Sequence, residues 1–169
     1  HLYLIALGSN QRHPLIGLPA DIVAEAFAAL EMDDIDVFAT SPIIASLPVG
    51  PSKRRFANAA AILSTPLDPP EFLWRLQEIE EHFGRERRGG KWSSRVLDLD
   101  IILWSGGLWA SEAPALAIPH AHMGLRGFVL QPAATIAPDW RDPLSNLTLR
   151  QLNTRFSKAK RLDQREQPL

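Results

Sequence analysis

The stretch from Gly84 to Trp104, GRERRGGKWSSRVLDLDIILW, constrains the chain most, because a basic loop leads directly into a segment with two aspartates. Apolar residues at positions 97, 99, 101 and 103 follow a period of two, which predicts a strand with one face in the core. Asp98 and Asp100 then share the other face. At ~3.3 Å rise per residue, their carboxylates lie roughly 6–7 Å apart.

Two carboxylates so close together repel each other and lose hydration on a half-buried strand, unless a cation lies between them. Mg²⁺ commonly takes one or two carboxylates together with waters and substrate phosphates, so Asp98 and Asp100 are candidate metal ligands. Two ions ~3.5–4 Å apart would fit this span. The alternative is a solvated outer face of an edge strand.

Five cations precede the aspartates within eleven residues, and Gly89, Gly90 and Trp92 interrupt them: Arg85, Arg87, Arg88, Lys91 and Arg95. Guanidinium groups match phosphate oxygens, and an aromatic ring can stack on a flat ligand. A solvated basic loop or a nucleic-acid patch would show the same residues. Cations next to a metal-competent carboxylate pair, however, favour a polyphosphate site.

Composition limits the remaining possibilities. The 169 residues are 46% hydrophobic, which predicts one compact domain, and we expect it to span residues 1–156 with a polar tail at 157–169. The net charge of −1 argues against a global attraction to nucleic acid or membrane. The chain has no cysteine and no apolar run of membrane-spanning length, so we expect a cytoplasmic protein.

The remaining pattern predicts alternating strands and helices. Strands are expected at 2–7, ending in a turn at Gly8, at 35–46, kinked or at an edge because of Pro42, and at 56–63. Helices are expected at 19–30 and from Asp68 to Gly84, with a short return strand near Trp109 and a short helix at 133–138. This order predicts an α+β ferredoxin-like sandwich with helices on one face and substrates at the other face or edge.

Three other motifs give weaker evidence about function. The turn at Gly8 lacks a following Gly-Lys-Ser/Thr, which disfavours a P-loop. The pair His120 and His122 has no further Cys or His nearby to complete a zinc site. The run from Arg126 to Leu130 resembles an RNA-recognition strand but lacks its second aromatic.

Several motifs follow one another in order along the chain: LGSN near the start, GR-x-R…W-x-x-R-x-LDLDI, and PH…RGF. In these motifs and their order, the chain resembles the 6-hydroxymethyl-7,8-dihydropterin pyrophosphokinases of the folate pathway. The similarity spans roughly Leu2 to Pro143. It implies a largely antiparallel central sheet flanked by helices, and transfer of pyrophosphate from ATP to the hydroxymethyl group of a reduced pterin, releasing AMP. Two Mg²⁺ ions are implied, together with ATP as co-substrate.

The resemblance also implies residue roles. Asp98 and Asp100 are implied as metal ligands and, with Arg85 and Arg95, as catalytic residues. The implied ATP-binding residues are Gln77, Glu80, Arg85, Arg87, Arg88, Trp92, Arg95, Ile101, His120 and Arg126. The implied pterin-binding residues are Ser46, Val49, Phe56, Asn58, Trp92, Asp98 and Phe128.

The sequence departs from the common family pattern at Lys91, at Ser93-Ser94 and at Ala121. The two serines replace Gly-Pro, so the segment before Arg95 is expected to be less preorganised. We expect a monomer with no nucleic-acid or membrane partner. An RNA-binding module and an ordinary phosphokinase remain as alternatives. The reaction products distinguish an ordinary phosphokinase from a pyrophosphokinase.

Overall fold

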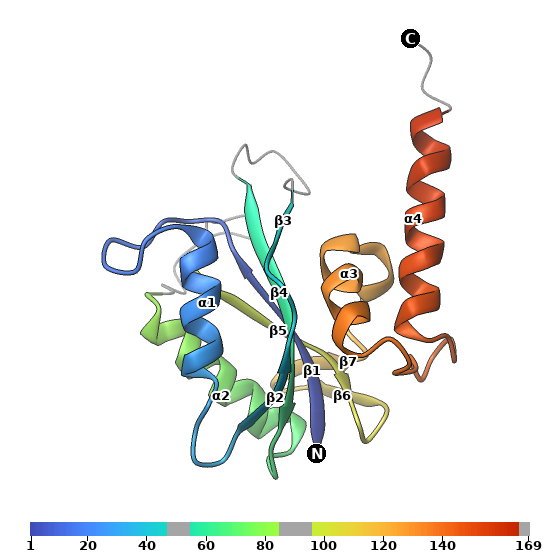
Figure 1. The fold of residues 1–169 in the computed structure, drawn as a ribbon. Coiled ribbons are helices and arrows are strands. Elements are labelled where there is room, and N and C mark those ends of the chain that lie inside the picture. Colours follow the sequence, from blue (N-terminus) through green and yellow to red (C-terminus); the bar gives the residue numbers. More distant parts are fainter. Residues whose placement is uncertain (47–54, 85–95, 166–169) are drawn as a thin grey trace.

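The computed structural model describes residues 1–46, 55–84 and 96–165, with side chains described up to residue 160. The chain contains both strands and helices, interspersed along its length (Figure 1). In order, the elements are β1 Leu2–Ser9, α1 Pro19–Ala29, β2 Asp36–Thr40, β3 Ile44–Ser46, β4 Phe56–Ser64, α2 Pro69–His82, β5 Asp98–Trp104, β6 Trp109–Glu112, β7 Ala115–Ile118, a 3₁₀ turn Met123–Leu125, α3 Gly127–Ile136 and α4 Leu149–Arg165.

The central sheet has the strand order β2-β4-β1-β5, and β3 adds to β4 beyond the end of β2. Each of these pairs is antiparallel, which confirms the predicted α+β class with an antiparallel sheet. The split of the expected 35–46 strand into β2 and β3 coincides with Pro42, which cannot donate to a ladder. β6 and β7 form a separate hairpin.

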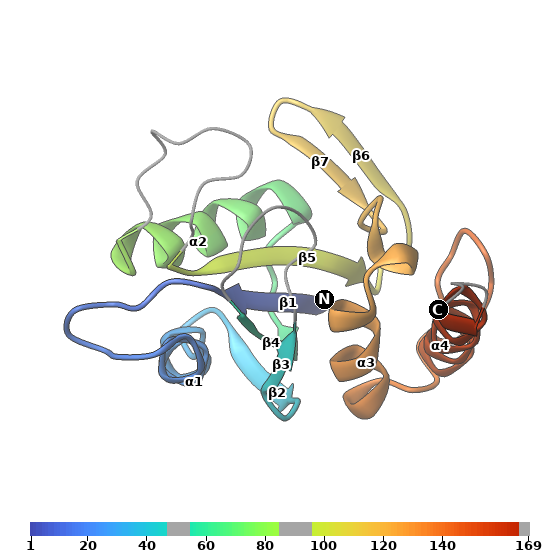
Figure 2. The same ribbon diagram turned by 90° about the horizontal axis from the view of Figure 1, so that it is seen from above.

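Helices cover both faces of the sheet, so the expectation of helices on one face is wrong. Figures 1 and 2 show α1 and α2 on one side and α3 on the other, with α4 outside α3. The alternating side-chain directions of β1 explain why both faces of the sheet are covered. Its odd residues, such as Ile5, pack in the core beneath α1 and α2, whereas Leu4 and Ala6 pack in a second core with Val129 of α3.

The start of α2 follows from its sequence. The Asp68 carboxylate accepts the Glu71 N–H at 3.0 Å, and the Glu71 carboxylate accepts the Asp68 N–H at 3.1 Å, a reciprocal capping box. Phe72, Leu76 and Ile79 are buried on the sheet side. Replacing an N-cap aspartate with alanine typically costs ~1 kcal/mol, so this cap contributes to holding α2 against β5.

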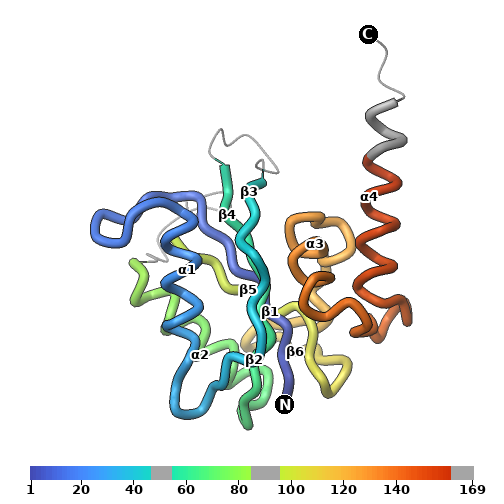
Figure 3. The backbone as a smooth tube through the Cα atoms, in the orientation of Figure 1, coloured from blue at the N-terminus to red at the C-terminus, as the bar shows by residue number. Residues whose placement is uncertain are grey.

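The C-terminal part differs from the sequence prediction. Residues 127–136 form one helix, whereas the sequence predicts a short helix only around residues 133–138. The polar segment after Phe156 continues α4 to Arg165, beyond α3 in Figures 1 and 3. Among the described residues, no helix combines the length and apolar character that crossing a membrane requires.

Candidate active site

The candidate site begins with a glycine at the centre of the sheet. Gly8 of β1 pairs with Asn58 of β4 on one side and with Asp98 of β5 on the other. Two residues before Gly8 on β1, Ala6 pairs with Asp100 of β5. Because directly paired residues point to the same face, Asn58 and Asp98 stand on either side of Gly8, and Asp100 stands beside Ala6, whose own side chain is buried in the second core. We call this row, in which Gly8 lies between the polar residues Asn58 and Asp98, the trough.

Sequence reasoning missed Gly8 as a site residue and placed it in a turn. The structure keeps Gly8 inside β1, which continues to Ser9. A Cβ at this position would lie 3.4 Å from Oδ1 of Asn58, an ordinary contact. Glycine inside a strand often marks the close approach of a ligand or another backbone, and this was the signal available in the sequence.

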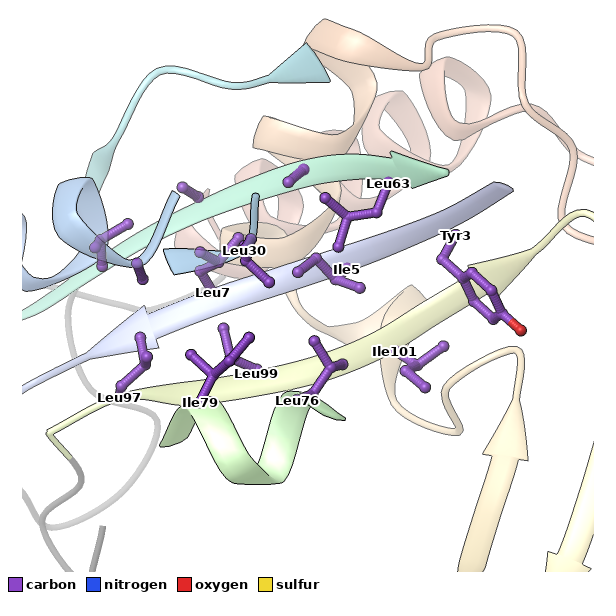
Figure 4. Packing of buried hydrophobic residues seen from close by; sticks show 14 of the residues in the cluster. Tyr3, Ile5, Leu7, Leu30, Leu63, Leu76, Ile79, Leu97, Leu99 and Ile101 are labelled. Carbon is purple, nitrogen blue, oxygen red and sulfur yellow. The ribbon is translucent and has the colours of Figure 1, made fainter. Parts of the chain in front are cut away.

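Asp98 and Asp100 lie on the trough face of β5, as the alternation predicts. The residues between and beside them point the other way. Leu97, Leu99 and Ile101 are buried against α2, as Figure 4 shows. Both aspartates are half-buried. Within the described parts of the chain, no group of three or more potential metal ligands gathers, so this pair is the donor set to consider.

Arg126 comes to the carboxylates from the opposite layer. Its Nη1 lies 3.6 Å from Oδ2 of Asp100, and about a third of each side chain remains exposed. Its guanidinium carbon also lies 5.9 Å from the ring centre of Phe128. Arg126 is the N-cap of α3, so the start of this helix brings both predicted residues to the trough.

His120 lies beside the same carboxylate. Its backbone N–H donates to the Ile102 carbonyl at 3.0 Å, which ties it to the edge of β5. Burial lowers the pKa of His120 below its ordinary value of 6.5; Asp100 opposes this shift, whereas Arg126 and His122 add to it. The His122 N–H donates to Nδ1 of His120, so the neutral ring carries its proton on Nε2.

The predicted pterin residues of β3 and β4 form one cluster. Asn58 is 4% exposed, and its Nδ2 donates to Oγ of Ser46 at 2.8 Å. Ser46 also pairs in register with Phe56, which is half-buried. Phe56 and Asn58 are two apart on one strand and so share a face. The structure therefore brings an amide, a hydroxyl and an aromatic ring to the trough's β4 side.

The predicted nucleotide residues of α2 lie in the other layer. Glu80 is 2% exposed, and its Oε1 accepts the Leu99 N–H at 2.7 Å. Gln77 is half-buried one turn before it. The side chain of Ile101 is buried in the α2 core. Any contact of Ile101 with a nucleotide must therefore use its backbone. Leu99 and Ile101 are alternate residues of β5, so their backbone N–H groups point to the same side, away from β1.

The predicted residues Val49, Arg85, Arg87, Arg88, Trp92 and Arg95 lie outside the described residues, as do Lys91 and Ser93-Ser94. Ala121 is exposed next to His120. The described part of the site thus consists of a carboxylate pair and an arginine at one end of the trough, and a buried amide at the other. Such an arrangement suits a polyanion at the β5 side and a flat polar ring at the β4 side.

The chain is similar to proteins of one known family. A family model described as 7,8-dihydro-6-hydroxymethylpterin-pyrophosphokinase (HPPK) matches residues 4–138. The 2-amino-4-hydroxy-6-hydroxymethyldihydropteridine pyrophosphokinase of Pseudomonas aeruginosa is 42% identical over 140 residues, which cover 82% of each chain. The protein of the same name from Synechocystis sp. is 40% identical over 153 residues, covering 90% of this chain and 74% of its own.

A solved structure shares the fold. It is a crystal structure of Plasmodium falciparum HPPK-DHPS, with a TM-score of 0.72 and 14% sequence identity. The match covers 95% of this chain and 45% of the Plasmodium chain, so this chain corresponds to less than half of that protein. From the family match and the two bacterial relatives, we conclude that the chain belongs to the 7,8-dihydro-6-hydroxymethylpterin-pyrophosphokinase family and has its pyrophosphokinase activity in folate biosynthesis.

Proposed function

We propose that Asp98 and Asp100 hold two Mg²⁺ ions that bind the triphosphate of ATP, and that the pterin lies across Gly8. The observation that carries this proposal is the position of both carboxylates on one face of β5, next to Arg126 and the trough. Half-exposed carboxylate oxygens fit the hard donors that Mg²⁺ prefers. Magnesium bound there would neutralise phosphate charge and polarise the phosphorus that is attacked.

In the proposed reaction, the pterin hydroxymethyl oxygen attacks the β-phosphorus of ATP in line with the leaving group. A bond forms between this oxygen and the β-phosphorus, and the bond from the β-phosphorus to the α,β-bridging oxygen breaks. AMP leaves with that oxygen and its electron pair, and the hydroxyl proton passes to a carboxylate or to solvent. The protein contributes mainly positioning and charge stabilisation, as in other phosphoryl transfers.

The arginines and His120 divide into two proposed roles. Arg126 and His120 position the triphosphate, since both lie beside Asp100. Neutral His120 can donate from Nε2 to a phosphate oxygen. Arg85 and Arg95 stabilise charge in the transition state, and Arg87 and Arg88 bind the triphosphate; these four follow from family resemblance because they lie outside the described residues.

The pterin side depends on the β3–β4 cluster. With Nδ2 of Asn58 donating to Ser46, its Oδ1 faces the position above Gly8, where it can accept from a pterin N–H. Phe56 and Phe128 offer aromatic faces to the ring. By family resemblance, we assign Val49 to the pterin pocket and Trp92 to closing it.

The nucleotide side uses the outer edge of β5, between the Leu99 N–H, which Glu80 accepts, and the Ile102 carbonyl, which accepts from His120. The backbone of Ile101 points outward there, and Gln77 lies nearby on α2. Glu80 already accepts the Leu99 N–H, so we propose that it also holds the strand segment between the two aspartates.

The experiment measures the Mg²⁺ dependence of pterin-dependent ATP turnover in Asp98→Asn and Asp100→Asn. Each change removes one negative ligand at nearly constant volume, so turnover should fall by orders of magnitude while the circular dichroism spectrum stays unchanged. Asp36→Asn is the matched control, because Asp36 is an exposed strand carboxylate on β2 at the other end of the strand order. Wild-type turnover in either site variant would remove the metal assignment.

A further inference from the structure

Helix α4 is attached to the molecule by a short apolar stripe. Thr148 and Gln151 start the helix with a reciprocal cap: the Gln151 N–H donates to Oγ1 of Thr148 at 3.2 Å, and the Thr148 N–H donates to Oε1 of Gln151 at 2.9 Å. Leu149, Leu152 and Phe156 follow at helical spacing and pack on the second core. The family match ends at residue 138, before this helix.

Phe156 is the residue of this stripe that reaches the beginning of α3. A Cβ added to Gly127 would collide with Cε1 of the Phe156 ring and would lie 3.0 Å from Cδ1 and Cζ. The backbone of Gly127 has no left-handed φ, so its conformation does not require glycine. Glycine is needed there because the ring of Phe156 lies directly on the backbone.

The residues on both sides of Gly127 belong to the candidate site. Arg126 precedes it and reaches Asp100, and Phe128 follows it. The Arg126 side chain makes no capping hydrogen bond to α3. The Arg126 N–H donates to the Met123 carbonyl at 3.2 Å, and the ring of Phe156 from α4 packs on the next residue, Gly127. Figures 1 and 3 show α4 alongside α3 for this part of its length.

We propose that Phe156 is a positioning residue for the pyrophosphokinase reaction: its ring fixes the Gly127 backbone and thereby sets where Arg126 and Phe128 meet the substrates. This inference rests on the proposed roles of Arg126 and Phe128. Phe156 itself touches neither substrate. A displacement of about 1 Å at a binding group can cost up to roughly 10²-fold in rate, so loss of this contact has a measurable effect.

A size exchange tests the contact. Phe156→Ala removes the ring and frees the Gly127 backbone, and we expect the KM values for ATP and pterin to rise roughly tenfold, with a smaller change in kcat. Gly127→Ala places a methyl group where the ring lies and should raise the same KM values. In the double variant the methyl group occupies the space that the ring vacated, so KM should return toward the wild-type values.

Leu152→Ala is the matched control, because Leu152 packs on the same core from the same helix without being the residue against Gly127. It should lower the unfolding temperature while leaving both KM values unchanged. Phe156→Leu, which keeps most of the volume, should give intermediate KM values, and it tests the proposal if the alanine variant does not fold. Equal KM values in Phe156→Ala and wild type, or additive defects in the double variant, would overturn the inference.

Arg126→Ala and Phe128→Ala separate this inference from the function on which it rests. If both raise KM and Phe156→Ala does not, the positioning role is wrong and the proposed site stands. If neither raises KM, the roles assigned to Arg126 and Phe128 are wrong. Every variant is assayed as the full chain, after circular dichroism has shown that it is folded.

Discussion

Arg126, the N-cap of α3, places its Nη1 3.6 Å from Oδ2 of Asp100 of β5 and so joins the helical layer to the carboxylate pair on the sheet. Both side chains are about one third exposed, and pairs of this kind contribute little to stability. The pair therefore has its main value in binding, where a guanidinium next to a metal-competent carboxylate can take a phosphate oxygen.

Arg126→Ala should raise the KM for ATP at least ~10-fold, while the free energy of unfolding changes by less than ~1 kcal/mol. Arg150→Ala is the control, since Nη2 of Arg150 on α4 lies 3.3 Å from Oδ1 of Asp139 in an exposed pair away from the site. Steady-state kinetics and chemical denaturation measure both quantities. A large loss of stability with an unchanged KM would assign the Arg126 pair to folding instead.

Gly8→Ala should fold and bind pterin poorly. The added methyl group lies 3.4 Å from Oδ1 of Asn58, which a strand accommodates, but it stands in the trough between Asn58 and Asp98. We expect the pterin KM to rise while ATP affinity changes little. Gly124→Ala serves as the control because its added Cβ meets nothing within 4 Å. An unchanged pterin KM in Gly8→Ala would place the pterin elsewhere.

Glu80→Ala should destabilise the protein by about 1–3 kcal/mol, because the Leu99 N–H loses its acceptor in a buried position. Glu80→Gln keeps an acceptor oxygen and should recover most of that stability. Since Leu99 lies between the two aspartates, the alanine variant should also require more Mg²⁺ for half-maximal turnover. If Glu80→Gln is as unstable as Glu80→Ala, the carboxylate charge matters more than the hydrogen bond to Leu99.

From the lowered pKa of His120 we predict that the stability of the protein depends on pH. Its pKa in the folded chain lies below the ordinary 6.5, mainly because of burial, so the unfolded chain binds the proton more readily. The free energy of unfolding should therefore fall as the pH drops from about 6.5 through the lowered folded pKa. His120→Gln should show a shallower fall over the same range. NMR titration that gives His120 a pKa above 6.5 would contradict this direction.

The carboxylate pair could be predicted from sequence because strand alternation is a local property. Apolar residues at every second position around Asp98 and Asp100 determine their common face wherever the strand lies. The start of α2 was equally local, since Asp68 and Glu71 form their own cap. These features need no knowledge of distant segments.

The other features of the fold and of the site depend on contacts between distant segments, which local sequence patterns do not reveal. Residues 127–136 are largely apolar and include Pro132, so their helical period is obscured, and α3 was predicted only in part. Gly8 can bend a chain or floor a pocket, and its partners Asn58 and Asp98 decide which. The close approach of Phe156 to Gly127 joins segments about thirty residues apart, which no local pattern reports.

The most direct test of the account is the nucleotide product in a reaction of the protein with ATP, Mg²⁺ and 6-hydroxymethyl-7,8-dihydropterin. If the Asp98 and Asp100 site directs attack to the β-phosphorus, chromatography will show AMP and pterin diphosphate in equal amounts, and Asp98→Asn will make both far more slowly. ADP with a pterin monophosphate, or AMP formed without pterin, would contradict the proposed transfer.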